Sequence, residues 1–366
     1  MSYDIAHLSS QFDIYGDYVN AVPFGTGHIN DTFQVAFDQC GTLIHYTFQR
    51  INHNVFKDPV SLMENVDRVT NHISKKIRQQ KQQASRHALR LVRAFDGKPY
   101  VLDQDGNYWR AYLFIEKVRT YDVLETANQA YQAAKAFAEF QHDLVDLPGG
   151  RLNETIPDFH NTPKRIANLE AAIAADKKGR VKEVQREIDF ILSRKADASK
   201  LLELNATGEI PERITHNDTK LNNVLIDDAT GEGVCVIDLD TVMPGLVHYD
   251  FGDMVRTGTS PAMEDEKDLS KVSMRFEMFE ALLRGYLSRA GKFLTPTERA
   301  MLPFSGKLIT LEIGTRFLTD YLEGDVYFKI HREEQNLDRC RTQLKLVESI
   351  EDQMDKMQQL LESINE

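Results

Sequence analysis

The sequence is short of residues that stabilise a fold through disulfides or metal–thiolate bonds. Its 366 residues include three cysteines, Cys40, Cys235 and Cys340, which lie far apart and form no CxxC pair. We therefore expect neither a disulfide framework nor a thiolate zinc site. Glycine (20) and proline (11) are too few for a linker or a collagen-like chain. The motifs GxxxxGK[ST], GxSxG and HExxH are absent, which removes the usual sequence support for a P-loop, a nucleophile elbow or a zincin site.

Long apolar runs are also absent. No window reaches the roughly 18 apolar residues that a transmembrane helix needs. The opening residues, MSYDIAHLSSQFDIYG, contain neither the basic nor the apolar segment of a signal peptide. We therefore expect a cytoplasmic protein with no membrane partner.

The chain does carry a clear excess of acidic charge, which is distributed unevenly. The formal net charge is −12, and residues 1–116 hold 12 basic and 12 acidic side chains. The whole excess therefore lies in residues 117–366. This balance argues against nucleic acid and anionic membranes as partners.

The hydrophobic pattern changes at about residue 116. Before it, β-like runs and turns surround one stretch at 60–83, where apolar residues recur at helical spacing. The expected strands are Ala21–Phe24, Thr32–Phe37, Thr42–Arg50, Tyr100–Asp103 and Tyr108–Ile115. After it, a β-like island at 214–240 interrupts helical patterns, which cover 126–145, 163–175, 181–203, 265–290, 296–322 and 335–364. The order predicts an α+β fold with a small antiparallel β-rich lobe at 1–116 and a larger, mainly helical lobe at 117–366. The apolar stripe at 335–364 is suited to packing on its own domain, and the pattern leaves the oligomeric state open.

The densest group of chemically active residues is the segment His216-Asn217-Asp218-Thr219-Lys220-Leu221-Asn222-Asn223. Phosphoryl transfer needs a carboxylate to align the attacking hydroxyl, a cation for the transferred group and hard oxygen ligands for Mg²⁺. Asp218 can serve as the base, Lys220 as the cation and Asn223 as a neutral oxygen ligand. All three lie within six residues, so one loop can supply them.

A second metal carboxylate is expected at the end of a neighbouring strand. Asp238 follows the apolar run Val234–Ile237 and lies 15 residues after Asn223. Two strands of roughly five residues and a turn take about that length, which returns Asp238 to the side of Asn223. Asp250-Phe251-Gly252 also spells the DFG motif of protein kinases. We assign the metal to Asp238 and expect Asp250 to brace the catalytic loop, since no strand of that hairpin precedes it.

The pattern H-x-D-x-K-x-x-N followed by a strand-terminal Asp resembles the protein-kinase-like superfamily. Within it, the chain is similar to the aminoglycoside phosphotransferase and choline kinase branch. The resemblance extends from about residue 20 to 350 and points to the N-acetylhexosamine 1-kinase subfamily. It rests on the segments GTGHINDTF, FQRIN, WRAYLFIE, THNDTKLNN, VIDLDTVMPG, YDFGD and TRFLTDYLEGDVYF.

This resemblance implies a bilobal kinase fold that uses ATP and Mg²⁺. It implies transfer of the γ-phosphate to the anomeric (C1) hydroxyl of N-acetylglucosamine or N-acetylgalactosamine. Asp218 then matches the catalytic base, with Lys220 beside it, and Asn223 and Asp238 match the metal ligands. The nucleotide would be bound by the phosphate loop, the hinge and a cation of the third strand, namely Gly25, Thr26, Gly27, Phe114, Ile115, Glu116 and Arg50.

The chain departs from the kinase pattern at two of these places. Asn30 stands where a protein kinase has its third loop glycine, and Arg50 replaces the third-strand lysine. Arg50 is a permanent cation that can bind phosphate oxygens, and Glu64 on the next helix is an open candidate to pair with it. For the sugar we expect contacts from His28, Asp218, Arg316 and Tyr327, while His216 orients the loop.

Several other readings remain open at this level. A kinase of the same fold could act on an aminoglycoside, choline, homoserine or methylthioribose. The run VIDLDTV at 236–242 also fits the nucleophile motif of a haloacid-dehalogenase-type phosphatase, with Asp238 as nucleophile and Asp240 as general acid. The remaining alternatives are an inactive kinase-like binding module and a two-metal hydrolase that uses His216, Asp218, Asp238 and His248.

Overall fold

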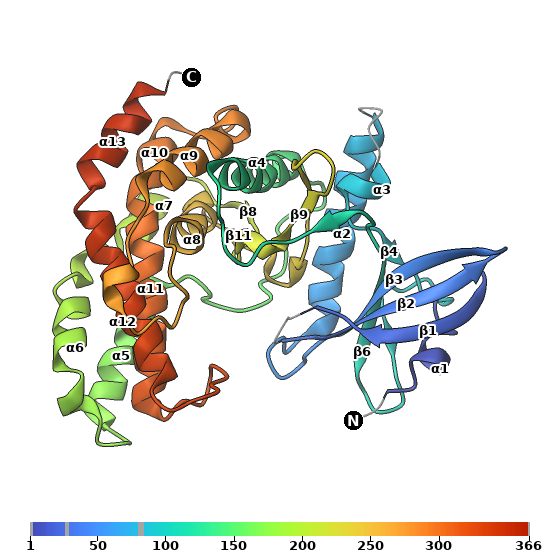
Figure 1. Cartoon of the computed structure of the whole chain (residues 1–366), viewed down its shortest axis with the longest axis horizontal. Coiled ribbons are helices and arrows are strands. Elements are labelled where there is room, and N and C mark those ends of the chain that lie inside the picture. The colour runs from blue at the N-terminus through green and yellow to red at the C-terminus, as the bar shows by residue number, and fades with distance from the viewer. Residues whose placement is uncertain (1–2, 26–28, 80–83, 365–366) are drawn as a thin grey trace.

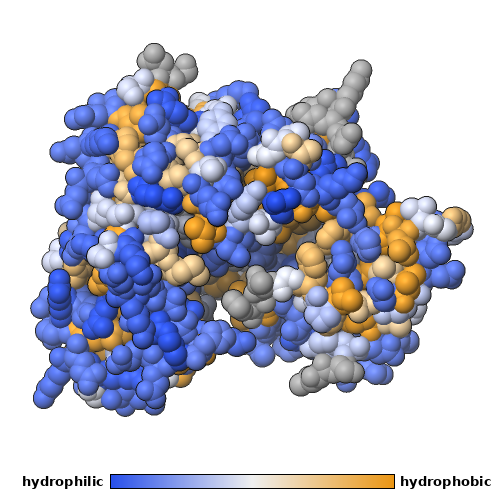
Figure 2. Space-filling model, viewed as in Figure 1, coloured by the Kyte–Doolittle hydropathy of each residue, from blue (hydrophilic) through white to orange (hydrophobic). Residues whose placement is uncertain are grey.

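The computed structural model describes residues 3–25, 29–79 and 84–364 and shows an antiparallel β-sheet region followed by a mainly helical region (Figure 1). This architecture confirms the α+β class. The surface is hollowed between the two regions (Figure 2). Among the described helices, none combines the length and apolar character needed to cross a bilayer.

The N-terminal sheet is antiparallel throughout, with strand order β1-β2-β3-β6-β4 and the short β5 also paired to β6. Its strands are β1 (Asp17–Pro23), β2 (Asp31–Gln39), β3 (Thr42–Arg50), β4 (Leu91–Val92), β5 (Val101–Leu102) and β6 (Tyr108–Leu113). Alternate residues such as Val35, Phe37, Phe48 and Trp109 form one buried cluster with the short helix α1 (Ile5–Ser9). This face of the sheet is therefore filled by its own core.

The helix α2 (Pro59–Gln79) covers the other face of this sheet and joins it to the helical region (Figure 1). Its apolar residues Met63, Val66 and Val69 are buried at three-residue spacing, as the sequence predicts. Val60, which shares that pattern, is 45 % exposed because the helix has only just begun at Pro59. The expected end of the helix at 83 lies outside the described residues, and the short α3 (Ala84–His87) follows.

The helical region contains ten α-helices among its described residues. They are α4 (Ala127–Leu144), α5 (Thr162–Ala175), α6 (Gln185–Leu192), α7 (Lys200–Ala206), α8 (Val247–Thr259), α9 (Phe276–Ala290), α10 (Pro296–Ala300), α11 (Leu302–Glu323), α12 (Gln335–Glu351) and α13 (Met354–Ser363). Five short strands complete it: β7 (Val118–Arg119), β8 (Arg213–Thr215), β9 (Val224–Asp227), β10 (Gly233–Val236) and β11 (Met243–Gly245). They form two antiparallel groups, β10-β9-β7 and β11-β8.

Several expected helices are shorter than the sequence pattern. The stretch 181–203 is broken into α6, α7 and two 3₁₀ turns, and the stretch 265–290 becomes α-helical only at Phe276, after a 3₁₀ turn at Leu269–Lys271. The long stripe at 335–364 is divided between α12 and α13. By contrast, α4 begins where the pattern places it, because Thr126 and Gln129 form a reciprocal capping box.

The helix α8 is absent from the helices predicted from the sequence. Its segment contains Gly252 and Gly258, and glycine weakens helices. The structure shows why a glycine is tolerated at position 252. A Cβ atom there would lie 2.4 Å from the Ser305 carbonyl oxygen of α11, so the absence of a side chain allows α8 and α11 to approach closely. Tertiary packing thus overrides intrinsic helix propensity.

A similar glycine lets α4 and α9 pack together, and this contact generates a stability test. A Cβ atom at Gly285 would lie 2.3 Å from the Tyr131 carbonyl oxygen. We expect Gly285→Ala to lower the free energy of unfolding by about 1–3 kcal/mol, because backbone atoms must move apart. Urea denaturation measures this. Arg284→Ala, which removes an exposed i,i+4 ion pair with Glu280, is the control and should cost less than about 0.5 kcal/mol. Equal stability of Gly285→Ala and the wild type would contradict the close approach.

Candidate active site

A hairpin brings the two halves of the predicted site together. The loop 216–223 follows β8, and the strands β9 and β10 then run antiparallel, with Val236 opposite Val224. The Ile237 amide donates to the Asn223 carbonyl oxygen at 2.9 Å. Asp238 is the next residue after Ile237 and therefore lies beside Asn223. This confirms the hairpin that the spacing of the two residues predicts.

The carboxylate of Asp250 holds the catalytic loop from inside. It accepts hydrogen bonds from the backbone amides of His216 (2.9 Å) and Asn217 (2.7 Å) and from Gln141 Nε2 (2.6 Å). The Tyr286 hydroxyl in turn donates to Gln141 Oε1 at 2.5 Å. Asp250 is fully buried, and burial raises its pKa even though these donors and the His216 ring favour the ionised form. The expectation that Asp250 braces the loop is confirmed.

The ring of His216 orients the same loop on its other side. The His216 Nδ1 atom accepts a hydrogen bond from the Asp218 amide at 3.3 Å, so Nε2 carries the proton that is donated to the Ile237 carbonyl oxygen at 2.9 Å. Neutral imidazole is sufficient for both bonds. The predicted orienting role of His216 is therefore confirmed, and this ring joins the loop to the strand end that carries Asp238.

The side chains predicted to be catalytic lie on this loop. Asp218 is partly exposed, and its Oδ1 lies 3.1 Å from Lys220 Nζ. Enclosure by protein would raise the pKa of Asp218, but the ammonium of Lys220 and the neighbouring His216 hold it below its ordinary value. Asn223 Nδ2 donates to the Asp218 carbonyl oxygen at 2.9 Å, which leaves Asn223 Oδ1 as an acceptor.

Asp238 differs from Asp218 in its electrostatic surroundings. Enclosure by protein and the nearby carboxylates of Asp240 and Asp218 raise the pKa of Asp238 to about 6. The side chain is nevertheless exposed, so water screens part of this effect and an ion can reach it. An amide oxygen from Asn223 and a carboxylate from Asp238 are hard ligands of the kind that Mg²⁺ prefers. The residues present therefore fit such an ion.

The structure adds a cation that the sequence analysis missed. Arg110 of β6 is fully buried and forms an ion pair with Asp240, and its Nε donates to Gln49 Oε1 at 3.0 Å. Asn30 Nδ2 donates to the other oxygen of Asp240 at 2.6 Å. Burial alone would lower the pKa of Arg110, but Asp240 raises it. An arginine inside the apolar segment WRAYLF could have indicated a buried cation. Its partner could not be identified from the sequence, because it lies 130 residues away.

The position of Arg50 requires a correction. Arg50 alternates with Phe48 on the face of β3 that carries the sheet's own core, opposite the face of Arg110. Its Nε donates to Asp31 Oδ2 at 2.7 Å. Glu64 instead accepts from Asn153 Nδ2 at 3.2 Å. Arg50 therefore does not fit the expected role of a phosphate-binding cation, and it does not pair with Glu64.

The two alternative hydrolase readings are also wrong. Asp240 is buried and both of its carboxylate oxygens are engaged, one by Arg110 and the other by Asn30, so neither is free to contact a leaving group as a general acid. Every strand pair among the described residues is antiparallel, unlike the parallel sheet that the phosphatase reading requires. His248 is buried, and its Nε2 bonds the Glu298 carbonyl oxygen at 2.9 Å, so it adds no ligand to a metal pair.

The predicted hinge residues 114–116 lie where the two regions meet. Phe114 follows β6 directly, and its amide donates to the His45 carbonyl oxygen at 3.0 Å. Ile115 is buried in a small cluster with Val234 and Cys235 of β10. The Glu116 carboxylate lies 2.6 Å from the His45 ring. Gly25 has a left-handed φ of 82°, whereas Thr26, Gly27 and His28 lie outside the described residues.

The two predicted sugar contacts in the C-terminal segment come together. The Arg316 guanidinium lies 5.8 Å from the centroid of the Tyr327 ring and 5.3 Å from that of Phe159. Arg316 and Tyr327 line a cavity of about 130 Å³ with Arg165 and Phe328. Tyr327 is 63 % exposed. It lies on the segment between α11 and α12, which extends toward the N-terminal region in Figure 1.

Comparison with solved structures shows the same fold in kinases of small molecules. An aminoglycoside phosphotransferase from Alicyclobacillus acidocaldarius superposes with a TM-score of 0.61 at 13 % identity, covering 97 % of this chain and 96 % of the other. A choline kinase from Cryptosporidium parvum gives a TM-score of 0.56 at 15 % identity, covering 98 % and 99 %. An ethanolamine kinase from Plasmodium vivax gives 0.53 at 14 % identity, covering 88 % and 82 %. These likenesses confirm the protein-kinase-like fold.

The sequence itself supports a closer assignment. Residues 20–286 match the model of the family described as "Phosphotransferase enzyme family". This match includes both the hairpin with Asp218, Asn223 and Asp238 and the Asp250 brace behind it. The chain therefore belongs to the phosphotransferase enzyme family.

Proposed function

We propose that this phosphotransferase transfers the γ-phosphate of ATP to the anomeric hydroxyl of an N-acetylhexosamine. The observation that carries the proposal is the assembly of Asp218, Lys220, Asn223 and Asp238 on one braced hairpin. A solved spectinomycin phosphotransferase with the same fold (TM-score 0.52, 13 % identity, covering 96 % and 98 % of the two chains) contains ADP and spectinomycin. That complex supports a nucleotide and a small hydroxyl compound as the two substrates.

In this proposal Asp218 aligns the acceptor hydroxyl and receives its proton. Its lowered pKa keeps it ionised at neutral pH, so it can accept a hydrogen bond before transfer begins. Lys220, 3.1 Å away, offsets negative charge that develops on the transferred group. Asn223 and Asp238 would hold Mg²⁺, which supplies charge neutralisation of the nucleotide phosphates. The nucleotide would lie between Gly25, Thr26 and Gly27 and the hinge at 114–116, with the N-terminal region at 1–116 as its binding lobe.

A charged cluster acts on Lys220. Asp218 has the largest effect and raises the pKa of Lys220, while Asp253 raises it and Arg256 lowers it. Arg256 pairs with Asp253 at 2.7 Å and with Glu264 at 3.0 Å, so one guanidinium is shared by two carboxylates. The proposal of an N-acetylhexosamine as acceptor therefore rests on the sequence resemblance and not on these charges. Arg316, Tyr327 and His28 are the proposed sugar contacts.

A buried pair connects the proposed sugar side to the catalytic loop. His160 Nδ1 lies 2.9 Å from Glu312 Oε1, and His160 Nε2 bonds the Asn217 carbonyl oxygen at 3.0 Å. Asn217 directly precedes Asp218 and has a left-handed φ of 65°, so its peptide needs such support. Glu312 is one helical turn before Arg316 on α11. His160 and Glu312 are therefore positioning residues for Asp218.

An acceptor screen tests the substrate class. We expect ADP release with N-acetylglucosamine or N-acetylgalactosamine to exceed release with glucose, galactose, choline, homoserine and an aminoglycoside. The sugar 1-phosphate is identified by mass spectrometry and its loss in mild acid. If only choline or an aminoglycoside is turned over, the proposed acceptor is wrong and the proposed kinase activity is kept. Phosphate release from a sugar phosphate without ATP would contradict both.

Replacement of Asp218 tests the catalytic assignment. We expect Asp218→Asn to lower kcat by roughly 100- to 10,000-fold, because the variant keeps the shape but loses the base. Asn222→Ala, in the same loop and hydrogen-bonded only to Asp122 among its recorded side-chain contacts, is the matched control and should retain activity. Steady-state kinetics on folded proteins measure both. Near-normal turnover of Asp218→Asn would remove this residue from the mechanism.

The His160–Glu312 pair has a predicted pH dependence. Burial alone would lower the pKa of His160, but Glu312 raises it above its ordinary value, and the pKa of Glu312 is lowered in return. The stabilisation from protonated His160 is complete below its unfolded pKa of about 6.5 and is lost as pH rises through the raised value. The stabilisation from ionised Glu312 is lost at low pH, as pH falls through the lowered value.

A double-mutant cycle of His160→Gln and Glu312→Gln measures this coupling by urea denaturation. We expect about 1–3 kcal/mol at pH 6 and a smaller value at pH 9. Because both residues position Asp218, each variant should lower kcat and leave the KM for ATP close to the wild-type value. A coupling that is independent of pH would contradict the charged pair.

A further inference from the structure

The helix α4 carries a group of metal-ligating side chains outside the set proposed for catalysis. Glu139, His142 and Asp143 occupy positions i, i+3 and i+4, which lie on one face of a helix. One ligand atom from each lies within 4.8 Å of the other two. His142 Nδ1 and Asp143 Oδ1 are 3.9 Å apart. The set combines one imidazole with two carboxylates.

Two of these side chains are left without the partners that buried polar groups normally have. Asp143 is 7 % exposed, and its carboxylate accepts no recorded hydrogen bond from the described residues. Lys76 and His72 bond only its backbone carbonyl oxygen. The Nδ1 atom of His142 is buried and also has no hydrogen-bond partner among the described residues. A bound water or ion is one explanation for an unpartnered buried polar group.

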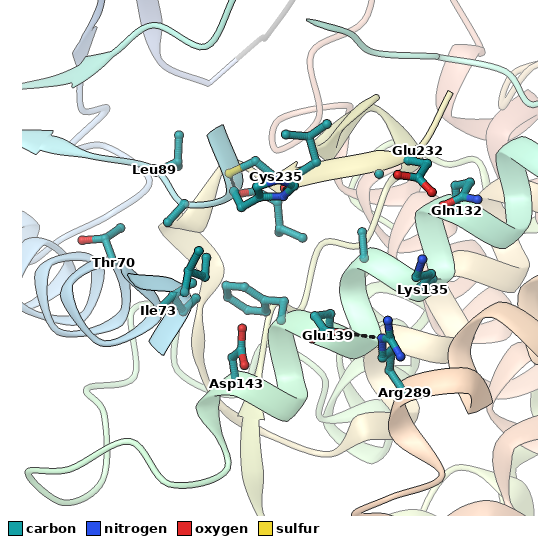
Figure 3. Close-up of a pocket in the computed structure, with 18 of the residues that line it drawn as sticks. Thr70, Ile73, Leu89, Gln132, Lys135, Glu139, Asp143, Glu232, Cys235 and Arg289 are labelled. Atoms are coloured by element: carbon teal, nitrogen blue, oxygen red, sulfur yellow. Dashed lines mark hydrogen bonds and ion pairs between the residues drawn. The ribbon is translucent and has the colours of Figure 1, made fainter. Parts of the chain in front are cut away.

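Glu139 and Asp143 line a cavity of about 350 Å³ that lies between α2, α4 and β10, whereas His142 is not part of its lining (Figure 3). Figure 3 shows the Asp143 carboxylate directed into this cavity, with Glu139 and Arg289 joined at its other side. The remaining wall combines apolar side chains such as Ile73 with polar ones such as Lys135. The cavity gives an ion an access route that does not pass through the catalytic site.

We propose that Glu139, His142 and Asp143 bind one divalent transition-metal ion of the zinc class. Imidazole and carboxylate ligands suit Zn²⁺, whereas Mg²⁺ prefers oxygen ligands alone. Three protein ligands leave a fourth coordination position for water or a small molecule. Arg289 already forms an ion pair with Glu139, so it competes with the ion for this ligand and lowers the affinity of the site. The proposal is independent of the phosphotransfer mechanism.

Calorimetric titration of the chelator-treated full chain with Zn²⁺ tests the proposal. Excess MgCl₂ is present to occupy the proposed Asn223–Asp238 site. We expect one equivalent of Zn²⁺ to bind and Asp143→Asn and His142→Gln to weaken binding at least about 10-fold. Arg289→Gln should instead tighten binding, because it frees Glu139 and removes a repelling charge. This opposite sign distinguishes ligand competition from a general loss of structure.

Asp146→Asn is the matched control. Asp146 lies just beyond α4 and is 66 % exposed at its side chain, so Zn²⁺ affinity should be unchanged. Thermal unfolding of each metal-free variant shows whether it is folded. If His142→Gln does not fold, the Arg289→Gln variant still tests the proposal. Equal Zn²⁺ affinity in Asp143→Asn, His142→Gln and the wild type would overturn the proposal, as would loss of binding in Asp238→Asn alone.

Discussion

The active site depends on one buried carboxylate. Asp250 sits on α8 and accepts both backbone amides that begin the catalytic loop, so a helix of the core fixes the direction in which that loop leaves β8. A buried carboxylate without donors would be strongly unfavourable. The donors are the loop itself and Gln141 of α4. The packing of α4, α8 and α9 is therefore coupled directly to the position of Asp218.

Charge is distributed around this frame so that neighbouring carboxylates have different surroundings. Asp218 has a cation beside it, Asp240 is neutralised by Arg110, and Asp238 is exposed among other carboxylates. These surroundings suit the roles proposed for Asp218 and Asp238 and give Asp240 a structural role in the Arg110 pair. The net acidic charge of residues 117–366 does not predict the local charge at this site, because Asp218 is paired with Lys220 and Asp240 with Arg110.

Local sequence signals predicted the parts of the molecule that local interactions determine. The hairpin from Asn223 to Asp238 follows from strand and turn lengths, and α4 follows from its capping box. The error at Arg50 was avoidable in principle, because strand alternation places residue 50 on the same face as Phe48. The Arg110–Asp240 and His160–Glu312 pairs could not be read from the sequence, since their partners are 130 and 152 residues apart. Tertiary packing brings them together, of β6 against the segment after β10 for the first pair and of α11 against the segment before α5 for the second.

The bond between Asn30 and Asp240 has a consequence for how sequences of this family can vary. Asn30 also accepts a hydrogen bond from the Asn52 amide, so one side chain connects the start of β2, the end of β3 and the segment after Asp238. A glycine at position 30 would loosen that junction and leave Asp240 with Arg110 alone. Replacement of Asp240 would in turn leave the buried guanidinium of Arg110 without its carboxylate partner. Substitutions at positions 30, 110 and 240 are therefore expected to covary, and the trio can serve as an alignment signature for relatives that use the same interlobe tie.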